Sequence, residues 1–216
     1  MKEETFLEKV CSNTGTSVAT TLIAASGGVY LAPLIPMLTA SFANNRYQKR
    51  VENAFFDVNE RLSPLEVAVK NLSDNQFKLV GEILSFIMHT TNDDKIELLK
   101  NAAISGVKSD GLQEHEASVL SRILRDISIV EFNYLDSIKH YDLIFSMGNM
   151  SAEKILEMKA KNKNGNKVVS VEEPEEQLLL NTLAGFDLLK VSGSGYGADY
   201  IYRLTPMSYK LFELCS

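Results

Sequence analysis

The stretch SDNQFKLVGEILSFIM, residues 73–88, carries both signals that define an amphipathic helix. Ser73 and Gln76 form a capping box, in which each side chain satisfies a backbone N–H group of the other at the start of a helix. Apolar residues then recur at helical spacing and share one face. The residues of this face are Phe77, Val80, Leu84, Ile87 and Met88. The stretch therefore predicts a helix with one buried face.

The same pattern recurs on both sides of this stretch, between residues 46 and 145. Three more segments place apolar residues at helical spacing, and Asn92 and Ser128 supply capping side chains. Breaks are predicted before Pro64 and near Gly106. The stripes are Val51, Phe55, Val58 and Leu62; Ile96, Leu99 and Ala103; and Ala117, Leu120, Leu124 and Ile127. Together these signals predict an acidic bundle of about five short helices over residues 46–145.

The composition changes after residue 145, where short β-branched and glycine-rich stretches appear. The predicted order is a short helix from Ser151, a strand VVSV, a helix that ends at Gly185, two strands joined by SGSGYGA, and a helix after Pro206. This order is typical of a winged-helix module. The expected fold class is therefore mainly α, a helical bundle with a C-terminal winged-helix-like module containing a small β-hairpin. The expected domains are residues 1–45, 46–145 and 146–216.

The N-terminal run, residues 10–45, contains no Asp, Glu, Lys, Arg or His. It is long enough for one membrane-spanning helix, but Gly27-Gly28 and two prolines interrupt it. The basic residues that follow would suit the cytoplasmic side of a membrane. Burial as two short helices against the bundle is the preferred interpretation, and membrane association stays open. The candidate membrane or partner contacts are Tyr30, Leu31, Leu34, Ile35, Arg46, Lys49 and Arg50.

The net charge of −6 is concentrated in the middle of the chain, where residues 51–150 carry nine Lys and Arg against sixteen Asp and Glu. A chain without a broad basic field does not attract phosphate backbones. The helix predicted at residues 172–185 contains no Lys or Arg, so it would read a major groove poorly. Nucleic acid is therefore a disfavoured partner.

The reactive side chains do not form a recognisable catalytic or metal-binding motif. His115-Glu116 lacks the second histidine of a zinc-protease helix, because position 119 is Val. Cys11 and Cys215 are too few for a secreted disulfide framework, and they predict reduced thiols in a cytoplasmic protein. The sequence thus predicts no enzymatic activity, no cofactor and no metal.

The glycine-rich loop near the C-terminus leads into a strand, whereas a phosphate-binding loop leads into a helix. It therefore predicts a flexible wing tip. Tyr196, Tyr200 and Tyr202 alternate across this hairpin. They are candidate wing contacts that could stack on bases, although tyrosines at this spacing more often cover a sheet face.

Three parts of the chain resemble a known family. They are LLKNAAISG in residues 98–106, SRILRDISIVEFNYLDSI in residues 121–138, and the closing NTLAGFDLLKV and YRLTPMSYKLFELC in residues 181–215. In their order and content these parts resemble the bacterial Abi-alpha (abortive-infection alpha) family over residues 46–216. The resemblance implies a role in phage defence, and the family offers no catalytic residues to carry over.

We therefore predict a non-enzymatic bacterial interaction protein, cytoplasmic or membrane-associated, that acts through protein–protein contacts in antiviral defence by abortive infection. The expected partner is an unidentified protein, with a membrane surface and a second copy of the chain as further candidates. Two alternatives remain open. One is a winged-helix DNA-binding transcriptional regulator, and the other is a membrane-associating effector that uses residues 10–45.

Overall fold

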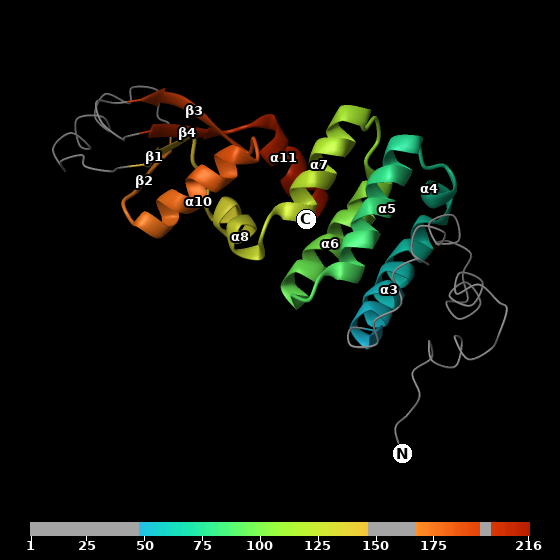
Figure 1. Ribbon diagram of the computed structural model, residues 1–216. Helices are drawn as coiled ribbons and strands as arrows, with labels where there is room; N and C mark the ends of the chain where they lie inside the picture. The colour runs from blue at the N-terminus through green and yellow to red at the C-terminus, as the bar shows by residue number, and fades with distance from the viewer. Residues whose placement is uncertain (1–47, 147–166, 195–199) are drawn as a thin grey trace, which may run out of the picture. The chain divides into compact units, whose positions relative to one another are not determined.

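The computed structural model describes residues 48–146, 167–194 and 200–216 (Figure 1). These residues are mainly helical, with a small sheet in the C-terminal part, which confirms the predicted fold class at this level. The chain divides into two compact units. The first holds the described residues up to Asp126 together with Leu214–Ser216, and the second holds Ile127–Glu213.

The first unit consists, within the described ranges, of helices. They are α3 (Gln48–Leu62), the 3₁₀ turn η3 (Ser63–Leu65), α4 (Glu66–Lys70), α5 (Asp74–His89), α6 (Asp93–Lys108) and α7 (Glu114–Asp126). α5 packs against both α6 and α7, and α3 packs mainly on α6 (Figure 1). The break before Pro64 is confirmed, but the short helix α4 that follows it was not predicted.

Both predicted N-caps of the first unit, Ser73 for α5 and Asn92 for α6, are present. The Ser73 hydroxyl accepts from the Gln76 backbone N–H at 3.3 Å, and the Gln76 side chain accepts from the Ser73 N–H at 2.9 Å. The amide of Gln76 also donates to the carbonyls of Val107 and Ser109, at 3.2 and 2.8 Å. The capping box therefore starts α5 and also ties it to the end of α6.

The core of the first unit lies where α5, α6 and α7 meet. Its largest fully buried side chains are Leu62, Leu79, Ile83, Leu84, Ile87, Leu99, Leu120, Ile123 and Leu124. Gly106 allows α5 and α6 to approach closely, because a Cβ atom there would lie 3.1 Å from Cγ2 of Val80. The helix end predicted near Gly106 agrees with the structure to within two residues, since α6 continues to Lys108, and the glycine itself serves packing.

The second unit combines helices with a four-stranded sheet. Its elements are α8 (Ile129–Ile138), β1 (Leu143–Ser146), β2 (Val168–Val171), α10 (Pro174–Gly185), β3 (Leu189–Ser194), β4 (Tyr200–Leu204) and α11 (Pro206–Cys215), whose last two residues belong to the first unit. The strand order is β2-β1-β4-β3. β1 pairs parallel with β2 and antiparallel with β4, and β3 and β4 form the predicted hairpin. α8 packs on α10.

The domain boundary differs from the one predicted after residue 145. α8 and β1 belong to the second unit, which begins at Ile127. β1 was not predicted, because an apolar run of only three residues, Leu143 to Phe145, does not distinguish a strand from the end of a helix. Its neighbours β2 and β4 supply the hydrogen bonds that make it a strand. The helix predicted from Ser151 lies outside the described residues.

α10 ends at Gly185, as predicted. Asp187, rather than Gly185, adopts the left-handed conformation, with φ of 61°. The carbonyl of Asp187 accepts from the Thr205 hydroxyl at 2.7 Å, and that of Leu188 accepts from the Thr205 N–H at 3.1 Å. Contacts from the segment between β4 and α11 thus hold this turn, so a glycine is not needed there.

Cys215 is the one described cysteine, and it is buried at the end of α11. Burial raises the pKa of its thiol to about 12, and nearby Lys95 opposes this only in part. At mildly alkaline pH its thiolate fraction should be about a thousandfold below that of an ordinary thiol. In a Cys11→Ser variant, we expect Cys215 to resist a disulfide-exchange reagent in the folded protein and to react at once in denaturant. Equal rates in both states would contradict this.

Candidate functional site

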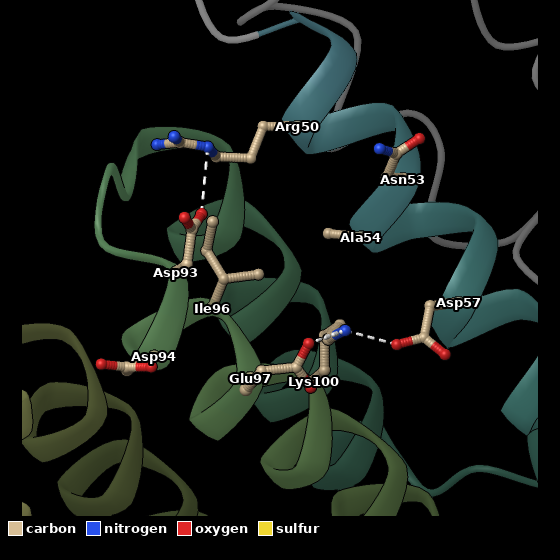
Figure 2. Close-up of a pocket in the computed structure, with 9 residues that line it drawn as sticks. All are labelled: Arg50, Asn53, Ala54, Asp57, Asp93, Asp94, Ile96, Glu97 and Lys100. Carbon is tan, nitrogen blue, oxygen red and sulfur yellow. Dashed lines mark hydrogen bonds and ion pairs between the residues drawn. The ribbon is translucent and has the colours of Figure 1, made fainter.

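A charged groove lies between α3 and α6 in the first unit (Figure 2). Its cavity volume is about 410 Å³. The residues that line it are Arg50, Asn53, Ala54 and Asp57 from α3, and Asp93, Asp94, Ile96, Glu97 and Lys100 from α6. We refer to these nine residues as the α3–α6 groove.

Lys100 lines one end of the groove, and only 7% of its side chain is exposed. Its Nζ atom donates to Oδ2 of Asp57 on α3 and forms an ion pair with Oε1 of Glu97, one helical turn earlier on α6. Burial alone would lower the pKa of Lys100, but the bonds to the two carboxylates outweigh it and raise the pKa above the ordinary value. Lys100 therefore stays charged and joins the two helices.

Asp57 is bonded on both of its oxygens. Oδ2 accepts from Lys100, and Oδ1 accepts from Nε of Arg61 at 3.0 Å. Arg61 also donates to Oδ1 of Asn101 at 3.0 Å and lies 3.8 Å from Oε2 of Glu97. Burial tends to raise the pKa of Asp57, but the Lys100 and Arg61 charges and hydrogen bonds hold it below its ordinary value. The carboxylate is thus ionised and fixed in position.

Arg50 closes the other end of the groove. Its Nε atom lies 3.0 Å from Oδ1 of Asp93, and its Nη1 atom donates to the carbonyl of Thr91 at 2.6 Å. The Arg50 and Asp93 side chains are 44% and 73% exposed, so this pair contributes little to stability. Two groups of charged contacts therefore connect α3 to α6, one buried and one at the surface.

The groove has an excess of negative charge, because four carboxylates and two cations line it. Asp94 is exposed and makes no ion pair with the residues that the structure describes. In Figure 2 its carboxylate extends away from Lys100, at the edge of the groove. Glu97 is 57% exposed despite its contacts with Lys100 and Arg61. Asp94 and Glu97 are therefore accessible to a cationic group from solvent.

The structure places only part of the predicted N-terminal contact set. Arg50 lies in the groove, and Lys49 precedes it on α3. The remaining members, Tyr30, Leu31, Leu34, Ile35 and Arg46, lie outside the described residues, as does the whole of residues 10–45. Among the helices that are described, none is both long and apolar enough to cross a bilayer.

The predicted wing contacts Tyr200 and Tyr202 differ in exposure, although their ring centroids lie 6.2 Å apart. Tyr200 is exposed, whereas Tyr202 is only 2% exposed and its hydroxyl donates to Oδ1 of Asn181 at 2.8 Å. Burial, followed by nearby Tyr200, raises the pKa of Tyr202. Tyr202 is therefore buried where its hydroxyl bonds to α10, and Tyr200 is the exposed member of the pair. Tyr196 lies outside the described residues.

Sequence reasoning missed Asp57, Glu97 and Lys100 as a group. The spacing of Glu97 and Lys100, and that of Asp57 and Arg61, is visible as local helical pairing. Which of these residues face each other across two helices depends on how each helix is rotated about its axis and on the register between the helices. The local sequence indicates neither the rotation nor the register. In the described ranges no group of three or more His, Cys, Asp and Glu side chains is arranged to hold a metal ion.

The fold and the groove together define a mainly helical protein of two units, with an acidic groove on the first. No family model matches the chain, and no curated protein or solved structure matches it.

Proposed function

We propose that this chain is a non-enzymatic interaction protein that binds a basic segment of a partner protein in the α3–α6 groove. The observation that carries the proposal is the accessible negative charge of Asp94 and Glu97 beside a preformed cavity. The resemblance to the Abi-alpha family supports bacterial phage defence as the setting. In that setting the contact with a partner, rather than a reaction, would be the output of the protein.

A cationic side chain of a partner would meet a carboxylate in this groove that is already held in position. Lys100 and Arg61 already contact Glu97, one of the two accessible carboxylates, so less of the side-chain entropy of Glu97 remains to be lost on binding. Arginine suits such a site, because its planar guanidinium can contact two carboxylates at once. Exposed charge pairs are screened by salt, so binding should be weak and should decrease as ionic strength rises.

A fluorescent oligoarginine peptide tests the proposal at low ionic strength. We expect the Asp94→Asn/Glu97→Gln variant to bind the peptide about fivefold or more weakly than the wild type, a loss of about 1 kcal/mol. The matched control is Asp110→Asn/Glu114→Gln, which removes the same charge from exposed positions outside the groove. Anisotropy titrations give both affinities. An equal loss in the two variants would show that the peptide responds to net charge only, and would refute the groove as the site.

The alternative of a DNA-binding regulator has one supporting observation. The partial strand order β1-β4-β3, with α10 before the β3–β4 hairpin, supports this alternative because a winged helix has the same order, although β2 adds a parallel strand beside β1. Against it, α10 has Glu175 and Glu176 in its first turn and no basic residue in its last. We therefore expect no salt-sensitive DNA binding tighter than the ~10⁻⁴–10⁻⁶ M of non-specific contacts. A sequence-specific gel shift at nanomolar protein would favour the regulator instead.

A further inference from the structure

Two like charges lie directly opposite each other on the hairpin of the second unit. Lys190 on β3 is the cross-strand partner of Arg203 on β4, and both side chains are exposed. Like charges in this arrangement destabilise a sheet. Neither side chain makes an ion pair with another residue that the structure describes. The two cations are thus available to an anionic surface, and we call them the hairpin basic pair.

We propose that the hairpin basic pair of one copy docks in the α3–α6 groove of a second copy. This inference rests on the proposed function and names the partner of the groove: another molecule of the same chain. The first argument is charge complementarity. The groove has four carboxylates against two cations, and the hairpin offers two cations without partners among the described residues.

The second argument is the spacing of the charges. Directly opposite residues on neighbouring strands have Cβ atoms about 4.5–5.5 Å apart. Asp94 and Glu97 are three residues apart on α6, and Cβ atoms at that helical spacing are about 5–6 Å apart. The two cations of one copy can therefore each meet one accessible carboxylate of the other. Asp94 is the better target, because it makes no ion pair with the described residues.

A second copy fits this surface better than nucleic acid does. The hairpin offers one cation pair, and the first turn of the preceding helix α10 carries Glu175 and Glu176, which repel phosphates. The contact joins two different surfaces, so it is heterologous: after docking, the copy that supplied the hairpin keeps a free groove, and the copy that supplied the groove keeps a free hairpin. Assembly by this contact should be weak, favoured by low ionic strength, and increasingly extended at high protein concentration.

The experiment uses charge reversal on the full-length chain. One variant is Lys190→Glu/Arg203→Glu, and the other is Asp94→Lys; all three side chains are exposed, so the fold should tolerate them. By sedimentation velocity at low ionic strength, the mass of the wild type should rise with concentration. Each variant alone should self-associate about tenfold or more weakly, because like charges now face each other. A mixture of the two should regain association, since each supplies the surface that the other has lost.

Three outcomes would overturn the proposal. The first is a wild-type chain that is monomeric at every concentration. The second is association that survives both reversals, and the third is a mixture no more associated than its components. If oligoarginine still binds the groove while self-association is absent, the proposed function stands and only this partner is refuted. Loss of DNA binding in Lys190→Glu/Arg203→Glu, without a change in mass, would assign the hairpin to nucleic acid instead.

Discussion

Leu120→Ala should lower the free energy of unfolding of the first unit by about 2–5 kcal/mol. Leu120 is 2% exposed on α7, which packs against α5. The substitution removes buried methyl groups and leaves a cavity that the close-packed helices can fill only in part. Urea denaturation followed by circular dichroism should show an earlier first transition with an unchanged slope.

Val67→Ala is the matched control for Leu120→Ala. Val67 lies in the same unit but is 74% exposed on α4, so its truncation should change the free energy of unfolding by less than about 0.5 kcal/mol. Equal midpoints for the wild type, Leu120→Ala and Val67→Ala would contradict the burial of this face of α7. An altered slope would instead indicate a change in the unfolded state or a loss of two-state behaviour.

Asp57→Asn should be the most damaging single change in the groove, lowering the free energy of unfolding by about 1–3 kcal/mol. It leaves Glu97 as the remaining carboxylate partner of buried Lys100. It also removes the Lys100–Asp57 ion pair, which joins α6 to α3. Lys100→Met should cost less, because a methionine of similar length carries no charge that must be desolvated. The double variant should therefore cost less than the sum of the two single variants. Strict additivity in this cycle would show that Asp57 and Lys100 are not energetically coupled.

The difference in free energy of unfolding between the wild type and Asp57→Asn should depend on pH. The pKa of Asp57 is lower in the folded chain than the ordinary value of 3.8, so its charge stabilises the fold fully above that pH. This contribution is lost as the pH falls through the folded-state pKa. The stability difference between wild type and Asp57→Asn should thus be constant near neutrality and shrink below about pH 4. A difference that grows on acidification would refute this ionic role.

The groove became visible only in three dimensions. Asp57 and Lys100 are far apart in the chain, and each has an ordinary local pairing with a neighbour on its own helix. Nothing local distinguishes them from other charged residues on a solvated helix face. Their contact depends on the angle at which α3 crosses α6, and side-chain packing between the helices determines that angle.

The sequence by itself determined the helical nature of the chain and the starts of its main helices. Capping boxes at Ser73 and Ser128, and the cap at Asn92, are local hydrogen-bonding patterns, so they survive any choice of tertiary arrangement. Tertiary structure alone decided β1, the left-handed turn at Asp187, and the burial of Tyr202. Each of these depends on partners distant in sequence: β2 and β4 for the strand, Thr205 for the turn, and Asn181 for the tyrosine. Local propensity does not predict such contacts, because they stabilise the chain only once the elements pack against each other.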